Sequence, residues 1–336
     1  MFALGGTIAS SADSGQAATV RITGAELLGG VPEARQVAAV EVHTLKMVPS
    51  GDLRLPDLLG LRSRVEAAVR SGVDGVVVTQ GTDTLEETSY AFELLTSLEV
   101  PVVFTGAMRN SSLPGSDGPA NLLAAVRVAA CPQARGLGTT VVFNDEIHSS
   151  RHVRKAHPSS TSAFASPGLG PIGYVSEDRV RILMRPAGRL HVRVPAAAAD
   201  ARVAQLTVFF DDDGRIIETV PALGYDGLVV AAFGGGHVPS WIAPILAKVA
   251  EQIPVVFTSR TNAGEGLRQT YAYPGSESDL ISRGLVPAVS VGTSHATVLL
   301  RLLLMAGVGR DALAWCFEQA SDPHGLVSVP AAGPSA

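Results

Sequence analysis

The stretch that most constrains the fold is an apolar run that breaks at one glycine and continues as a helical pattern. It reads Val76-Val77-Val78-Thr79-Gln80-Gly81-Thr82-Asp83-Thr84-Leu85-Glu86-Glu87-Thr88. The pattern predicts a buried strand, a tight turn at Gly81 and the start of a helix. The first N–H groups of a helix have no partner inside it and carry partial positive charge, so this turn can stabilise an anion or a developing oxyanion. Ordinary helix capping by Thr82 or Asp83 is the alternative interpretation.

The same alternation of strands and helices continues along the whole chain. Short apolar runs predict strands, and apolar residues at helical spacing predict helices. We expect strands at 37–45, 75–79, 100–105, 139–144, 203–210, 227–233 and 254–258, and helices at 55–70, 85–98, 118–130, 241–251, 294–306 and 311–319. The predicted fold class is therefore α/β, with mostly parallel sheets flanked by helices.

A change of pattern divides the chain into two domains. Alternating residues at 175–183 and 189–194 predict a hairpin around Arg185-Pro186-Ala187-Gly188, and Pro195-Ala196-Ala197-Ala198-Ala199-Asp200 reads as a linker. We expect an N-terminal catalytic domain at 1–194, a linker at 195–203 and a smaller α/β domain at 204–336.

Composition excludes several classes of protein. Of the 336 residues, 17% are charged and 46% hydrophobic, which argues against disorder, and the net charge of −5 without basic stripes argues against nucleic-acid binding. Cys131 and Cys316 have no metal or redox spacing, so we expect free thiols. Residues 1–6 lack a basic start and a long apolar segment, so we expect no signal peptide, no membrane partner and a cytoplasmic location.

Several turns should meet at one edge of the first sheet, because ligands of open parallel sheets bind beyond the carboxyl ends of the strands. The turns are Gly5-Gly6-Thr7, Gly81-Thr82-Asp83, Thr105-Gly106-Ala107-Met108-Arg109 and Asn144-Asp145. A threonine hydroxyl is a weak nucleophile unless a neighbour removes its proton. Lys155, one of only three lysines, is a candidate for that role, and a surface lysine is the alternative. The polar loop at 11–19 reads either as a lid over the substrate or as a plain surface connection.

These motifs together resemble the bacterial L-asparaginase and glutaminase-asparaginase family. The match runs in order through the first domain and is looser in the second, at Gly234-Gly235-Gly236 and Ser259-Arg260. In the first domain it comprises Gly5-Gly6-Thr7-Ile8-Ala9, Gly81-Thr82-Asp83-Thr84-Leu85-Glu86-Glu87-Thr88, Gly106-Ala107-Met108-Arg109, Asp117-Gly118-Pro119-Ala120-Asn121-Leu122 and Ser166-Pro167-Gly168-Leu169-Gly170-Pro171-Ile172-Gly173.

The resemblance implies catalytic roles for four residues. Thr7 would attack the side-chain amide carbon and form an acyl-enzyme. Thr82, Asp83 and Lys155 would handle the proton, and the Thr82 N–H group would stabilise the oxyanion.

The resemblance also implies a substrate pocket. Asp83 would bind the α-ammonium group and Ser50 the α-carboxylate, with Gly81 lining the same turn. The carbonyl of Ala107 would face the leaving amide nitrogen. A carboxylate for an ammonium and a hydroxyl for a carboxylate agree with elementary hydrogen-bond chemistry.

Three positions depart from the family pattern. Residues 10–22 contain no tyrosine, whereas family members commonly carry one there that contacts the first threonine hydroxyl. Gly51 stands where the family often has glutamine and His237 where it often has asparagine, and no neighbouring-subunit glutamate matches near Tyr271 and Tyr273. We expect asparagine to be preferred over glutamine, with His237 compensating at the amino-acid end from a neighbouring subunit. A solvent-facing loop histidine is the alternative.

Other signals point away from metals and cofactors. His148 and His152 are four residues apart but follow a strand, so a zinc site is not expected. Gly234-Gly235-Gly236 lacks dinucleotide-binding spacing, and Asp211-Asp212-Asp213-Gly214 fits a turn between strands better than a calcium loop.

The sequence therefore predicts a cofactor-free amidohydrolase of asparagine catabolism that converts L-asparagine into L-aspartate and ammonia. The partners expected are a small amino-acid substrate and further copies of the chain, in a dimer or tetramer. A catalytically weak amino-acid sensor of the same fold, and an amidase for another small amide such as glutamine, remain open as alternatives.

Overall fold

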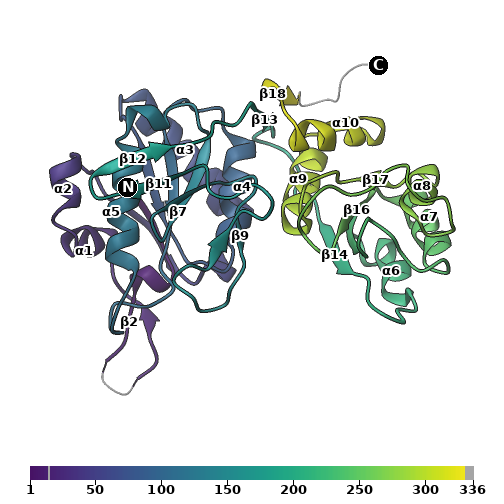
Figure 1. Ribbon diagram of the computed structural model, residues 1–336, viewed down its shortest axis with the longest axis horizontal. Coiled ribbons are helices and arrows are strands. Elements are labelled where there is room, and N and C mark those ends of the chain that lie inside the picture. The colour runs from purple at the N-terminus through teal and green to yellow at the C-terminus, as the bar shows by residue number, and fades with distance from the viewer. Residues whose placement is uncertain (14–15, 330–336) are drawn as a thin grey trace. The chain divides into compact units, whose positions relative to one another are not determined.

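The structure is a computed structural model that describes residues 1–13 and 16–329. The chain divides into two compact units, Met1–Pro186 (unit 1) and Ala187–Ala336 (unit 2), each with its own sheet (Figure 1). Residues 187–194, expected in the first domain, therefore lie in unit 2.

Unit 1 is built on an eight-stranded sheet in the order β12-β11-β8-β7-β6-β5-β1-β4. Its strands are β1 (Phe2–Gly5), β4 (His43–Val48), β5 (Val76–Thr79), β6 (Val102–Thr105), β7 (Thr139–Phe143), β8 (Glu146–Ser149), β11 (Gly173–Ser176) and β12 (Arg179–Ile182). The five strands from β4 to β7 are mutually parallel, and β8, β11 and β12 continue the sheet antiparallel.

Helices cover both faces of this sheet. They are α1 (Gly24–Gly29), α2 (Ala34–Val37), α3 (Leu55–Arg70), α4 (Leu85–Leu95) and α5 (Gly118–Ala129). Val103 of β6 packs into one apolar cluster with α1, α2 and α5, whereas the next residue, Phe104, contacts Phe92 of α4 with ring centroids 5.6 Å apart. The central strands are therefore buried on both faces, which is why they form continuous apolar runs in the sequence. The predicted α/β class is confirmed.

Short elements complete unit 1. They are η1 (Thr7–Ala9), β2 (Ser10–Ser11), β3 (Thr19–Val20), η2 (Ser50–Asp52), η3 (Pro132–Ala134), β9 (Arg154–Lys155) and β10 (Phe164–Ala165). The pairs β2–β3 and β9–β10 are antiparallel. The pair β2–β3 flanks the loop predicted at 11–19, of which residues 14 and 15 lie outside the described residues.

Unit 2 contains a four-stranded parallel sheet in the order β14-β15-β16-β17 and a separate parallel pair, β13 with β18. The strands are β13 (Gly188–Val192), β14 (Val203–Thr207), β15 (Gly227–Ala232), β16 (Val255–Ser259), β17 (Val286–Pro287) and β18 (Gly325–Val329). The helices are α6 (Arg215–Thr219), η4 (Pro221–Leu223), α7 (Ala243–Gln252), α8 (Glu277–Ser282), α9 (Thr293–Met305) and α10 (Arg310–Ser321). The apolar side chains of α6, α7 and α8 join one core cluster with the sheet.

Three local predictions were wrong. The hairpin lies between β11 and β12, with its turn at Glu177 (φ 56°), whereas β13 pairs with β18 near the other end of the chain. The alternating run at 175–183 was read as one strand, but Glu177 and Asp178 interrupt it and Ser176 pairs with Arg179 across them. The strand expected at 37–45 is β4, which begins only at His43, and the acidic turn at 211–213 connects a strand to α6 rather than to a strand.

Both cysteines are free thiols, as predicted. Within residues 1–13 and 16–329, no helix is long and apolar enough to cross a membrane.

Candidate active site

The candidate site lies where the chain reverses its direction of winding through the unit 1 sheet. Strand β1 sits between β4 and β5, so the connections that follow it reach opposite sides of it. In doubly wound folds the crevice beyond the carboxyl ends of such strands binds ligands. Thr7, Ser50, Thr82 and Ala107 follow the carboxyl ends of β1, β4, β5 and β6, respectively.

Glycines let the backbones of these turns touch. A β-carbon on Gly6 would lie 2.0 Å from the nitrogen of Gly81, and Gly6 has a φ of 84°, which L side chains rarely adopt. A β-carbon on Gly81 would in turn lie 2.9 Å from the hydroxyl oxygen of Ser50. The residues that follow, Thr7 and Thr82, are therefore brought to the same place by direct contact between their turns.

Thr7 is the first residue of η1 and is half-buried. The peptide before it is fixed twice: Gly6 donates from its N–H group to the carbonyl of Val48 (3.0 Å), and the Ser10 hydroxyl donates to the Gly6 carbonyl (2.9 Å). The hydroxyl of Thr7 makes no hydrogen bond with any residue that the structure describes. The backbone at Thr7 is thus fixed, while the Thr7 hydroxyl is available to a substrate.

Thr82, Asp83 and Lys155 form one hydrogen-bonded cluster. The ammonium nitrogen of Lys155 lies 2.9 Å from Thr82 Oγ1 and 2.5 Å from Asp83 Oδ1. The Thr82 side chain is buried, that of Lys155 is 16% exposed and that of Asp83 is 77% exposed. Helix α4 has Thr84 as its N-cap, without a side-chain capping bond, so the capping interpretation of Thr82 and Asp83 is wrong.

The same turn offers free hydrogen-bond donors. The N–H groups of Gly81, Thr82 and Asp83 reach no acceptor within the described part of the chain. Unsatisfied N–H groups beside a buried hydroxyl form a binding place for an anion or a developing oxyanion.

Ser50 and Ala107 flank the cluster. Ser50 is buried; its Oγ accepts from the Thr84 N–H group at a long 3.4 Å, and its carbonyl accepts from the Thr84 hydroxyl (3.0 Å). The neighbouring Gly51 is exposed, and a β-carbon there would meet no atom within 4 Å. Ala107 is fully buried, and its carbonyl accepts no hydrogen bond from the described residues.

Asp117 and Asn121 hold the turn around Ala107, a function that sequence reasoning did not assign to them. The Asp117 carboxylate accepts from the N–H groups of Met108 (2.9 Å) and Arg109 (2.8 Å). The Asn121 amide donates to the carbonyl of Gly106 (3.1 Å). The peptides on both sides of Ala107 are therefore fixed from α5, and the conspicuous Asp-Gly-Pro-Ala-Asn motif was the available signal.

Two glutamates of α4 were also missed, because acidic residues in a first helical turn look like ordinary helix stabilisers. Glu86 is buried and accepts from the backbone N–H group of Lys155 (2.6 Å). Burial first, and then the charges of Glu86 and Asp83, raises the pKa of Glu87 to about 7. Its Oε2 atom is buried without a hydrogen-bond partner among the described residues.

His237 lies in unit 2, where its ring contacts two tyrosines and a glutamate. Its Nδ1 atom lies 2.8 Å from the hydroxyl of Tyr273, and Tyr271 meets the ring edge-on. Its Nε2 atom is 2.9 Å from Glu277 Oε2 but out of line for a hydrogen bond. Burial opposes ionisation of Glu277, but the N–H groups of Tyr271, Glu277 and Thr270 outweigh it and hold the pKa of that carboxyl below its usual value. The ring is 18% exposed, so it is not the freely solvated loop histidine of the alternative reading.

His148 lies in β8, and His152 follows it by four residues. His148 is buried in β8 with Nδ1 3.0 Å from the hydroxyl of Ser166, and burial lowers the pKa of both histidines, that of His152 to about 4. Within residues 1–13 and 16–329, no group of three or more His, Cys, Asp or Glu side chains is placed to hold a metal ion.

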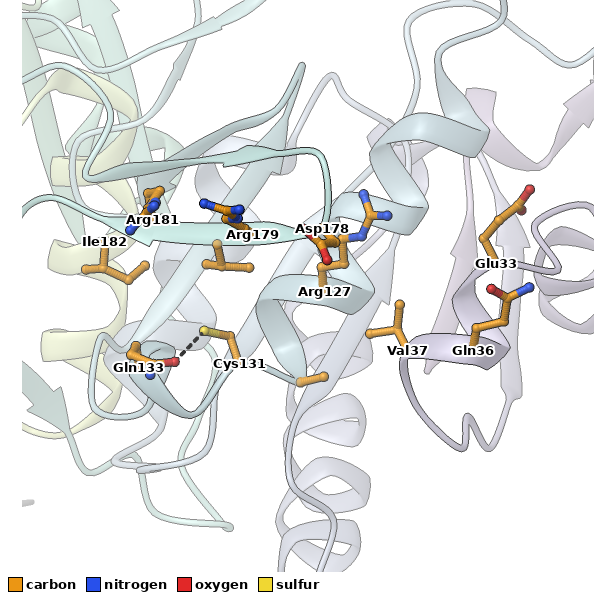
Figure 2. A pocket seen from close by; sticks show the side chains of 12 residues that line it. Glu33, Gln36, Val37, Arg127, Cys131, Gln133, Asp178, Arg179, Arg181 and Ile182 are labelled. Atoms are coloured by element: carbon orange, nitrogen blue, oxygen red, sulfur yellow. Dashed lines mark hydrogen bonds between the residues drawn. The ribbon is translucent and has the colours of Figure 1, made fainter.

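A separate pocket of about 820 Å³ lies along the edge strand β12 of unit 1 (Figure 2). It is lined from α2, α5, η3 and β12, and contains none of the predicted site residues. In Figure 2, Arg179 and Arg181 point to the side of β12 opposite Ile182, so the arginines do not converge on its apolar floor.

The fold and the site define an α/β protein with a cluster of hydroxyl, ammonium and carboxylate groups at a strand switch point. Residues 1–188 match the family model "Asparaginase, N-terminal", and residues 202–317 match "Glutaminase/Asparaginase C-terminal domain". The chain therefore belongs to the asparaginase family.

Relatives from several bacteria match most of the chain. It is 35% identical to an L-asparaginase of Bacillus licheniformis over 89% of this chain and 93% of the relative. It is 33% identical to a glutaminase-asparaginase of Pseudomonas fluorescens biotype A over 84% of this chain and 80% of the relative. The crystal structure of a probable cytoplasmic L-asparaginase from Campylobacter jejuni superimposes with a TM-score of 0.85 at 30% identity, covering 94% of this chain and 98% of that one.

Proposed function

We propose that the protein hydrolyses the side-chain amide of L-asparagine to give L-aspartate and ammonia, through an acyl-enzyme on Thr7. Membership of the asparaginase family and L-asparaginase relatives over most of the chain support the reaction. The observation that carries the site assignment is the cluster of Lys155, Thr82 and Asp83 beside the unbonded hydroxyl of Thr7.

The chemistry divides into two displacements. The oxygen of Thr7 attacks the amide carbon, and its proton passes through the hydroxyl of Thr82 to Lys155, which accepts it as a neutral amine. The free N–H group of Thr82 then donates to the carbonyl oxygen on which negative charge develops. The carbon–nitrogen bond then breaks, and the leaving nitrogen takes up a proton and departs as ammonia. Water attacks the resulting ester, the bond to Thr7 breaks, and the hydroxyl regains its proton.

The remaining contacts would hold the amino-acid end of the substrate. The exposed carboxylate of Asp83 suits an α-ammonium group, and the Ser50 hydroxyl beside the free N–H group of Gly81 suits an α-carboxylate. The unbonded carbonyl of Ala107 can accept from the leaving amide nitrogen. His237 would act at the same end from a neighbouring copy.

Ammonia release by the purified protein tests the reaction, with L-asparagine, L-glutamine and their D-forms as substrates. We expect L-asparagine to be the best substrate and the Thr7→Ala and Thr82→Val variants to lose roughly 10³-fold or more in kcat. Acid-quenched wild-type protein should carry an aspartyl ester on the peptide that contains Thr7. Retention of a tenth or so of the activity by Thr7→Ala, or an ester on another residue, would overturn the assignment of the nucleophile.

Glutamine is the substrate of the second candidate function, which the similarity to a glutaminase-asparaginase favours. One extra methylene is discriminated by only about 1–3 kcal/mol in a pocket of fixed size. Equal turnover of both amides would make the protein a glutaminase-asparaginase.

We further propose a homo-oligomer, a dimer or tetramer, in the cytoplasm. The family resemblance supports the assembly, and the relative from Campylobacter jejuni is described as a probable cytoplasmic enzyme. Sedimentation velocity across a range of concentrations tests the assembly, and a monomer with full activity would exclude it.

A further inference from the structure

Helix α4 and the turn before it bind both the main chain and the side chain of Lys155. The turn that precedes α4 receives the ammonium group, at Thr82 and Asp83, while Glu86 accepts from the backbone N–H group of the same lysine at 2.6 Å. Glu86 is the second residue of the helix, so both contacts with Lys155 lie at this end of α4. Lys155 therefore lies alongside the start of α4, fastened at main chain and side chain.

The strand that carries Lys155 supplies little rigidity of its own. Strand β9 has two residues and pairs only with the two-residue β10, with Lys155 opposite Phe164. An isolated two-stranded ribbon is marginal in water even at greater length. The loop beyond it is tied back by one bond, from the N–H group of Ala156 to the carbonyl of Ala163 (2.7 Å). Phe164 of β10 packs on Phe143 of β7, with ring centroids 4.8 Å apart, and the contact with α4 adds the bond that fixes the main chain of Lys155 itself.

The burial of Glu86 makes its hydrogen bond important for the position of the Lys155 backbone. Glu86 is 8% exposed, so little solvent is at hand to replace its carboxylate as an acceptor. Loss of this acceptor leaves the part-buried N–H group of Lys155 unsatisfied and favours a shift of the backbone. A shift of Lys155 moves its ammonium nitrogen away from Thr82, and a misplacement of about 1 Å can cost roughly 100-fold in rate.

We infer that Glu86 is a positioning residue, which sets the place of the Lys155 backbone and thereby of its ammonium group against Thr82. The inference rests on the proposed function, because it presumes that Lys155 handles the proton. Glu86 touches neither substrate nor reacting atoms in this scheme.

Helix α4 also contains a matched control. Glu93 is 4% exposed, lies on the same helix and accepts from a backbone N–H group, that of Thr139, at 2.5 Å. Thr139 begins β7 and lies at the amino end of that strand, away from the turns of the site. Removal of either carboxylate should lower stability alike, but only Glu86 should affect turnover.

The experiment compares wild type, Glu86→Ala, Glu86→Gln and Glu93→Ala by ammonia release and by crystal structure. We expect Glu86→Ala to lower kcat about 30- to 100-fold with KM for asparagine within about threefold, because Asp83, which would bind the substrate, lies in the turn before α4 and not on β9. Glu86→Gln keeps an oxygen acceptor and should restore kcat to within about fivefold of wild type. Glu93→Ala should keep kcat within about twofold, and only Glu86→Ala should move the Lys155 nitrogen by about 1 Å or more from Thr82.

Two outcomes would overturn the inference. One is a kcat for Glu86→Ala equal to that of Glu93→Ala. The other is a Glu86→Gln variant as slow as Glu86→Ala with Lys155 in its wild-type position, which would show that charge rather than position matters. Should Glu86→Ala fail to fold, Glu86→Asp serves in its place, because its shorter side chain can keep the bond only by drawing Lys155 toward α4.

Failure of the proposed function would look different. A wild-type protein that releases no ammonia from any of the amides would refute the function. The position of the Lys155 nitrogen in the crystal structures would still decide whether Glu86 places it.

Discussion

A methyl group at Gly6 should damage both stability and catalysis, because the turn after β1 is in backbone contact with the turn after β5. The β-carbon of an alanine there would lie 2.0 Å from the nitrogen of Gly81 and 2.1 Å from its α-carbon. Ordinary van der Waals contact begins near 3.4 Å, so the two turns must part by about 1.4 Å. Neither contact is with a flexible side chain that could move aside.

The cost has two parts. With a φ of 84° and a ψ of −171°, Gly6 has a backbone conformation essentially restricted to glycine, which costs an alanine about 1–3 kcal/mol, and forced overpacking adds roughly 1–3 kcal/mol. We therefore expect Gly6→Ala to lower the free energy of unfolding by about 2–6 kcal/mol, a large share of the 5–15 kcal/mol typical of a domain. Because Thr7 moves with Gly6, kcat should fall about 100-fold or more in the molecules that remain folded.

Gly168→Ala separates the two parts. Gly168 has nearly the same φ, 82°, but a β-carbon there would meet no atom within 4 Å. It should lose only the conformational part, about 1–2 kcal/mol, and keep its turnover. Urea unfolding and ammonia release measure both variants. Equal stability losses, or a Gly6→Ala enzyme with wild-type kcat, would refute the backbone contact between the turns.

Two further predictions concern the same region. The native state holds the proton of Glu87 up to about pH 7, whereas the unfolded chain loses it near 4.5, so stability should fall between these values by up to about 3 kcal/mol. Glu87→Gln should remove this fall in urea titrations at pH 5 and 8, and an unchanged pH dependence would contradict it. Gly51→Gln has room for its side chain and should raise glutaminase activity relative to asparaginase activity. Two coupled ammonia assays, one with each amide, measure the ratio. An unchanged ratio would mean that the pocket does not extend to position 51.

Local patterns of the sequence were sufficient where a single element decides its own structure. The helix expected at 55–70 is α3, Leu55–Arg70, because a proline in its first turn and an unbroken apolar period define both its start and its face. The turns after β1, β5, β6 and β7 could be assigned to one edge of a sheet for the same reason. Parallel strands separated by helices must end together.

Long-range pairing could not be predicted in this way. Strand β13 was joined to the preceding strands, but it pairs with β18 more than 130 residues later, Gly188 opposite Gly325. Nothing within 188–192 encodes a partner at such a separation. Glu86 escaped notice similarly, because a glutamate in the first turn of a helix has a sufficient local explanation and its hydrogen bond to Lys155 crosses 69 residues.

The activation of Thr7 is the step for which this chain departs most from the family pattern. Residues 10–22 contain no tyrosine, and Tyr174 is on β11, five strand positions from β1, or about 24 Å across the sheet. The proposed scheme therefore gives the proton of Thr7 to the Lys155 cluster. Lys155→Met should therefore prevent the acyl-enzyme from forming at all, rather than slow its hydrolysis. An ester on Thr7 that accumulates in Lys155→Met, seen by mass spectrometry after acid quench, would show that a different group removes the first proton.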